Sequence, residues 1–288
     1  MKSQNKRKPT QKGDIFMKLK KILATVLATV SVFAAVSMVS CGEKANYVAT
    51  AIESEDNEQY GLAVGKNSTN KAAILAAMNT VIADIEIGDI VSYYDAIYAG
   101  ETPSVTLQFP DLSDNTAGTL QVYTNAEFAP FEFRDDKQNI VGVDMYIMQL
   151  VGEEMNMKIE FHDIAFDAIV GKIAEEDNAV GAAGMTIYDE PKEKVDFSDP
   201  YYSTVQCIIS KEGEAFSKLD DLKGKKIGVQ KGTTGWKMIA DAIESGVLKD
   251  SGAEVIQYDN GPVAYTALKA GKCDVVVIDE LPAKKLVK

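Results

Sequence analysis

Apolar and polar positions show two different periodicities along the chain after residue 118. Short runs rich in β-branched and aromatic residues indicate strands at 120–124, 158–164, 179–185, 205–210, 226–230, 253–258 and 273–278. Between them, apolar residues recur at helical spacing over 143–155, 166–176, 234–245 and 262–271. Strands that alternate with helices in this way predict α/β layers with largely parallel sheets.

The pattern before residue 118 predicts fewer elements. It indicates a strand near Tyr47–Ile52, a second strand over 58–66, and helices over 70–88 and 89–100. Residues 100–118 are rich in Pro, Ser, Thr, Asp and Gly, which is typical of a linker. A short α/β piece therefore precedes the linker, and a longer α/β body follows it.

The chain is long enough for two cores. It has 288 residues, and about 250 remain if a front segment is removed, which is large for one α/β core and suits two. The aromatic stretch FSDPYYSTV, residues 197–205, does not have the pattern of another helix. It indicates an extended segment that crosses from one core to the other.

Residues 1–40 have the layout of a secretory signal. From Met17, a lysine-rich head precedes an apolar run that begins at Ile22 and ends in small residues at Cys41. The ending Met38–Gly42 resembles a bacterial lipobox, which implies that Cys41 is diacylated and becomes the new N-terminus. A membrane anchor helix is the alternative, because the run is near spanning length. Met17 is also a candidate for the true start, since the residues before it add nothing recognisable.

The net charge excludes several classes of partner. It is −13 for the whole chain, and eight Lys/Arg against one Asp make residues 1–40 strongly basic, which leaves about −20 for residues 41–288. Such an acidic surface argues against binding to nucleic acid or anionic lipid.

Cys207 and Cys273 lie in apolar, strand-like contexts without metal or redox spacing. We expect two buried free thiols, although an extracytoplasmic protein also permits a disulfide.

The last residues continue the alternation of strands and helices. Val275–Ile278 is an apolar strand, and Asp279 precedes a predicted helix with Pro282 in its first turn. An α/β domain that stops there lacks its next elements, unless they lie elsewhere in the chain.

Five segments carry a resemblance to a known family. They are LQVYTNAEFAPFEF, GMTI, KVDFSDPYY, KKIGVQKGTTG and CDVVVIDE. In this order and spacing they resemble the extracytoplasmic amino-acid-binding proteins of ABC importers, solute-binding protein family 3, over nearly all of 119–288. The resemblance implies a two-lobed α/β fold of periplasmic-binding-protein type II, in which each lobe is a mainly parallel sheet flanked by helices.

The order of the segments departs from that family. There, further strands and two closing helices follow the strand that ends in Asp, and here residues 45–100 resemble that portion. Reading from Lys288 into Ala45 restores the usual order, so the resemblance implies a circular permutant. A fusion of one fragment to a truncated second copy is the alternative, and permutation is favoured because each element occurs once. A bridge over 100–117 would span about 23 Å on average, which suits surface termini that lie close together.

These assignments predict a domain plan. Its parts are the signal (1–40), the start of the mature chain with a strand of lobe 2 (41–57), lobe 1 (58–200) including the linker 100–117, the hinge (201–205), and the rest of lobe 2 (206–288).

A cleft that buries a zwitterionic amino acid needs an anion for the ammonium and donors for the carboxylate, because unpaired buried charge costs several kcal/mol. Asp279 ends an apolar strand, where α/β sheets present groups to a crevice. The resemblance places the ammonium-binding Asp at this position, and a helix N-cap is its alternative role. The turn Gly232–Gly235 between a strand and a helix is an anion-site candidate, with Thr233 and Thr234 as its contacts, or else an ordinary turn.

The resemblance implies six further ligand contacts. Gly184 would act through its backbone and Thr186 through its hydroxyl. Phe128 and Phe166 would form aromatic walls around the ligand side chain, although both also suit a plain core. The polar groups that would recognise the ligand side chain are Asn125 and Gln230.

One departure from the family pattern concerns the ligand carboxylate. The family has an Arg shortly after the GMTI segment that pairs with it in a bidentate manner, and here Pro191 stands at that position. Arg134 lies in an exposed-looking turn, and Lys192 or Lys194 would not be equivalent clamps. A different anchor, a ligand without an α-carboxylate, and weakened binding all stay open.

The sequence therefore predicts a substrate-binding lipoprotein of an ABC importer. It would be a monomer outside the bacterial cytoplasm, held to the outer face of the cell membrane by its lipid alone, which captures a polar amino acid or related small solute for the permease. No cofactor, metal or catalytic residue is expected, and His162 is most simply a strand residue. A ligand sensor or scaffold with lost or altered binding is the alternative. A dehydratase-like enzyme, which needs an acid–base pair in the cleft, is a further one.

Overall fold

The computed structural model describes four stretches of the chain: residues 46–53, 57–189, 193–214 and 216–288. The predicted signal, the lipidation site Cys41 and the substituted position Pro191 lie outside these stretches. No helix within them combines the length and apolar character needed to cross a membrane.

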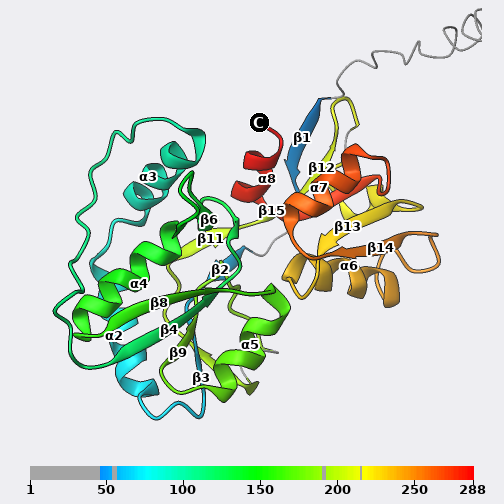
Figure 1. The fold of residues 1–288 in the computed structure, drawn as a ribbon. Coiled ribbons are helices and arrows are strands. Elements are labelled where there is room, and N and C mark those ends of the chain that lie inside the picture. Colours follow the sequence, from blue (N-terminus) through cyan, green and yellow to red (C-terminus); the bar gives the residue numbers. More distant parts are fainter. Residues whose placement is uncertain (1–45, 54–56, 190–192, 215) are drawn as a thin grey trace, which may run out of the picture. The chain divides into compact units, whose positions relative to one another are not determined.

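Lobe 2 is built on a five-stranded sheet in the order β1–β12–β15–β13–β14 (Figure 1). Its strands are β1 (Tyr47–Ala51), β12 (Gln206–Lys211), β13 (Lys226–Gln230), β14 (Glu254–Tyr258) and β15 (Val275–Asp279). Because successive side chains of a strand point to opposite faces, β15 serves two cores. Val275 and Val277 join the core of α6 (Thr234–Glu244) and the short helix η3 (Leu219–Leu222), whereas Val276 and Ile278 join that of α7 (Gly261–Lys269) and α8 (Glu280–Leu286).

Lobe 1 has a five-stranded sheet in the order β10–β3–β9–β4–β8. Its strands are β3 (Ala63–Gly65), β4 (Thr119–Thr124), β8 (Lys158–Asp163), β9 (Ala179–Gly181) and β10 (Val195–Phe197). Helices α2 (Lys71–Asp84) and α4 (Val143–Glu154) pack on one face, with α3 (Ile87–Ala99) beside α4, and α5 (Phe166–Glu175) covers the other face. A small sheet of β5 (Glu127–Phe128), β6 (Glu132–Arg134) and β7 (Ile140–Val141) completes this lobe.

Two strands carry the chain between the lobes. β2 (Glu58–Tyr60) leads from β1 of lobe 2 into β3 of lobe 1, and β11 (Tyr202–Thr204) returns from β10 to β12. The two strands pair antiparallel, with Tyr60 opposite Tyr202. Residues before the linker thus supply an edge strand to lobe 2, one crossing strand, and an internal strand of lobe 1.

Three details of the predicted elements are wrong. Each sheet is mixed rather than mainly parallel, because the strands next to the crossings, β12 and β3, run antiparallel to their neighbours. The segment 58–66 forms two strands, since the chain leaves the β11 pairing at Gly61, where a side chain would lie 2.9 Å from Ile187. The predicted strand 179–185 ends at Gly181, and the chain turns at Gly184, whose φ is +55°.

Other predictions are confirmed. Cys207 and Cys273 are buried free thiols. His162 lies in β8 and stacks on Tyr123 of the neighbouring strand β4. The segment 100–117 contains neither helix nor strand, and the Tyr146 hydroxyl of α4 donates to the Gln108 carbonyl at 2.9 Å. That contact holds the segment against lobe 1.

Candidate functional site

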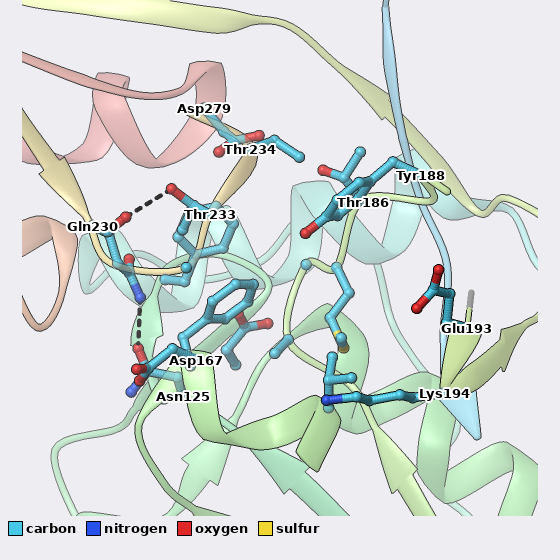
Figure 2. Close-up of a pocket in the computed structure, with 18 residues that line it drawn as sticks. Asn125, Asp167, Thr186, Tyr188, Glu193, Lys194, Gln230, Thr233, Thr234 and Asp279 are labelled. Atoms are coloured by element: carbon cyan, nitrogen blue, oxygen red, sulfur yellow. Dashed lines mark hydrogen bonds between the residues drawn. The ribbon is translucent and has the colours of Figure 1, made fainter. Parts of the chain in front are cut away.

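A cavity of about 340 Å³ lies between the two lobes, within the range of small-molecule sites. All nine residues predicted to bind a ligand line it: Asn125, Phe128, Phe166, Gly184, Thr186, Gln230, Thr233, Thr234 and Asp279. Figure 2 shows polar members of this lining converging from both lobes. The structure therefore brings the sequence candidates together, from β4 to the last strand of the chain.

Asp279 ends β15 with its side chain almost fully buried, at 6% exposure. It occupies the N-cap position of α8, but its side chain makes no capping hydrogen bond. The Tyr60 hydroxyl of the crossing strand β2 donates to Asp279 Oδ1 at 2.7 Å instead. Burial, followed by the charge of Glu58, raises the pKa of Asp279 to about 7, while hydrogen bonds from Tyr60 and Gln206 act in the opposite direction. An ammonium group beside this carboxyl would return it to the charged form.

Glu132 of β6 is a second buried carboxyl that lines the cavity. Its exposure is 1%, and neither carboxylate oxygen has a hydrogen-bond partner within the described residues. Burial, together with the charges of Asp144 and Asp279, raises the pKa of Glu132 well above its usual value. A buried polar group without a partner is costly, so this carboxyl is a binding group that the protein itself leaves unsatisfied.

Gly184 was expected to contact a ligand through its backbone, and its N–H is already used. Its N–H donates to Asp144 Oδ2 at 2.9 Å, and the Tyr201 hydroxyl donates to Asp144 Oδ1 at 2.7 Å. Asp144 is fully buried at the start of α4, and burial raises its pKa to about 6. This carboxyl therefore fixes the Gly184 turn to the start of α4 and to the crossing segment.

The hydroxyl donors expected to hold a ligand carboxylate converge on Glu58 of β2. Thr186 Oγ1 from lobe 1 donates to Glu58 Oε2 at 2.8 Å, and Thr234 Oγ1 from lobe 2 donates to the same oxygen at 2.7 Å. Gln206 Nε2 donates to Glu58 Oε1 at 3.2 Å. One carboxylate of the crossing strand thus joins donors from both lobes.

The remaining polar candidates form a second bridge between the lobes. Gln230 Nε2 of β13 donates to Asn125 Oδ1 at the end of β4, at 3.1 Å, and Asn125 Nδ2 donates to the Ile164 carbonyl (Figure 2). Thr233 is the N-cap of α6, where its hydroxyl accepts from the Trp236 N–H at 3.2 Å. Its hydroxyl also donates to the Gln230 carbonyl at 2.9 Å. These contacts shape the lobe 2 wall of the cavity.

Several lining residues were not predicted to contact a ligand: Glu132, Asp167, Val170, Ala183, Met185, Tyr188 and Glu193. Glu58 was missed as well. A signal for Glu132 existed, because it is a charged residue between Phe131 and Phe133 in a run that otherwise forms core. Glu58 has no comparable signal, because its role depends on three partners that are distant in sequence.

The ligand-free protein is expected to lose stability relative to an Asp279→Asn variant as the pH rises from about 4 to about 7. The pKa of Asp279 is raised from 3.8 to about 7 in the fold, so the folded state holds a proton that the unfolded chain releases. The resulting stability is present near pH 4 and is lost as the pH rises through about 7. The difference should approach roughly 1.4 kcal/mol per pH unit in that window. Urea unfolding of both proteins measures it, and parallel pH curves would contradict the expectation.

Comparison with known proteins agrees with this geometry. The family model of bacterial extracellular solute-binding proteins, family 3, matches residues 120–257. The probable histidine-binding protein of Neisseria gonorrhoeae is 34% identical over 175 residues, which are 60% of this chain and 63% of that protein. The chain thus matches less than two thirds of the length of this curated relative.

Solved structures show the same relationship. An ancestral arginine-binding protein bound to arginine is 40% identical, with a TM-score of 0.54, over 59% of this chain and 74% of that one. An ancestral amino acid-binding protein, a precursor of cyclohexadienyl dehydratase, is 31% identical, with a TM-score of 0.50, over 56% of this chain and 70% of that one.

Two lobes joined by crossing strands around a ligand-sized cavity define a solute-binding protein of the α/β periplasmic-binding-protein class, which confirms the predicted fold class. The chain belongs to family 3 of the bacterial extracellular solute-binding proteins, and the relatives compared above are amino-acid-binding proteins.

Proposed function

We propose that this protein captures a small solute with an ammonium group between its two lobes and delivers it to the permease of an ABC importer. The observation that carries the proposal is the pair of buried carboxyls, Asp279 and Glu132, that line a cavity of about 340 Å³. Acidic groups without a resident cation match an ammonium ligand. A polar amino acid, as bound by the relatives, is the starting class of ligand.

Binding rather than catalysis is the proposed activity. The cavity holds carboxyls with raised pKa values, which is a feature of enzymes as well as of binding sites. His162 lies in β8 and is not among the residues that line the cavity. The relatives compared here are binding proteins, although one of them is a dehydratase precursor.

We also propose that the chain is a circular permutant with a lipid anchor at Cys41. Residues 46–99 supply β1, β2 and β3 once each, and each fills a different place in the two lobes. The similarity covers 59% of this chain and 74% of the arginine-binding relative, and the family model begins only at residue 120, which a permuted order would explain. The lipobox-like ending of the front segment supports secretion and lipidation at Cys41. The protein would act as a monomer outside the cytoplasm.

A thermal-shift panel with the proteinogenic amino acids and with related amines tests the proposal. A ligand at about 100 times its Kd should stabilise the fold by roughly 2.7 kcal/mol. We expect a shift with at least one ammonium compound and no turnover of that compound by mass spectrometry. Turnover would support an enzyme, and the absence of any shift would support a scaffold.

A further inference from the structure

In the described part of the chain, the hydroxyl donors expected to hold a ligand carboxylate are already hydrogen-bonded to other groups. The hydroxyls of Thr186 and Thr234 and the amide of Gln206 already donate to the Glu58 carboxylate. A ligand carboxylate would compete with Glu58 for these donors and would lie beside its negative charge. Glu58 thus uses side-chain donors that would otherwise be available to an α-carboxylate.

Cationic side chains in the described part of the chain do not replace these donors. Arginine stands only at positions 7 and 134. Arg134 is bound elsewhere, because its Nη2 donates to Asp163 at 2.8 Å and its Nη1 donates to the Gln138 carbonyl. Lys194 is the only positively charged group among the described residues that line the cavity. Figure 2 shows Lys194 at the opposite end of the view from Thr234 and Asp279.

Negative charge dominates the lining. Four carboxyls line the cavity: Glu132, Asp167, Glu193 and Asp279. Asp167 pairs with Lys231 at 2.6 Å, whereas Glu132 is buried and neither of its oxygens has a hydrogen-bond partner among the residues that the structure describes. No group of three His, Cys, Asp or Glu side chains in the described part of the chain is arranged to hold a metal ion. A buried carboxyl without a partner gains one, and its charged form, when an organic cation binds beside it.

The aromatic and apolar walls of the cavity suit the alkyl chain and a second ammonium group of such a cation. Phe128 and Phe166 line the cavity with Tyr188 and Val170. Aromatic faces attract ammonium groups and also cover alkyl chains. Asn125 and Gln230, which bind each other across the cleft, offer neutral polar atoms at the far side of the lining from Thr186 (Figure 2).

We propose that the cavity binds a small cationic amine that lacks an α-carboxylate, best a dication, with one ammonium group held between Asp279 and Glu132. This assignment rests on the proposed function as a solute binder and specifies its ligand class. Glu58 acts as an internal substitute for the missing carboxylate and keeps donors of both lobes satisfied.

Calorimetric titration with three matched pairs tests the assignment. The pairs are putrescine with ornithine, cadaverine with lysine, and agmatine with arginine, whose members differ by the α-carboxylate. We expect at least one amine to bind at least tenfold more tightly than its amino-acid partner. Equal or tighter binding of the amino acids would overturn the assignment and leave the proposed function intact. If no compound of the wider amino-acid and amine panel binds, both fail.

A Glu58→Ala variant tests the mechanism. Removing this carboxylate frees the hydroxyls of Thr186 and Thr234, so the amine-to-amino-acid affinity ratio should fall at least tenfold. A Glu58→Gln variant serves if the alanine variant is unstable, because it keeps the side chain and removes its charge. Glu53→Ala is the matched control: Glu53 is exposed, precedes the same crossing, and accepts from Ser217. An unchanged ratio in a folded Glu58 variant would contradict the role of Glu58.

Discussion

Replacing Asp279 by Asn should weaken binding of the tightest amine or amino acid by at least about a hundredfold. Removing one partner of a buried charge pair costs roughly 3–5 kcal/mol, and 1.4 kcal/mol is a factor of ten in affinity. The fold should persist, because the amide oxygen can still accept from the Tyr60 hydroxyl that now donates to Asp279 at 2.7 Å. Calorimetry at pH 8 measures the loss, and thermal unfolding of the ligand-free variant checks its integrity.

Asp259→Asn is the matched control for this experiment. Asp259 follows β14, a strand of the same lobe 2 sheet, but it is exposed and does not line the cavity. Its replacement should change affinity less than twofold, because exposed charges at a distance are screened by salt. An Asp279 variant within tenfold of the unmodified protein would show that the ammonium is held elsewhere.

The sequence predicted the parts of the site that depend on one segment at a time. Asp279 is recognisable because a charged residue ends an apolar strand, and Thr233 because a polar residue precedes a helix. Both positions are set by local pattern, and their cavity location follows from where α/β strands end. The two lobes were predictable for the same reason, since each strand and helix has its own periodicity.

What the sequence did not show depends on contacts between distant segments. Glu58 gains its role from Thr186, Gln206 and Thr234, which lie between 128 and 176 residues further along the chain. Likewise, Gly184 was expected to contact a ligand through its backbone, but a buried carboxyl 40 residues away accepts from its N–H. The direction of the strands next to the crossings was also missed, because an apolar run has the same pattern in parallel and antiparallel pairing.

A chain of residues 118–288 alone should fail to form the native fold. Without the earlier residues, β10 loses β3, its neighbour in the sheet of described strands, and the β9 edge opens. The fully buried side chains of Leu62, Val64, Ile74 and Met78 would be lost from the lobe 1 core. Each contributes roughly 1.5–3 kcal/mol on burial, so together they approach or exceed half of a typical stability of about 5–15 kcal/mol. Loss of the near-ultraviolet circular dichroism signal and of cooperative unfolding would report the failure.

The same residues in the order 102–288 followed by 46–101 should restore the fold and the ligand affinity. The start of β1 and the end of α8 lie side by side, since Tyr47, Val48 and Val287 line one surface depression, and Figure 1 shows the two elements adjacent. A short Gly/Ser linker between Lys288 and Asn46 should therefore suffice. Because the packed elements are unchanged, its unfolding midpoint should match that of the parent within a few degrees. A reordered chain that stays unfolded, or a 118–288 chain that folds alone, would contradict a permuted single binding protein and favour a fusion with a second copy.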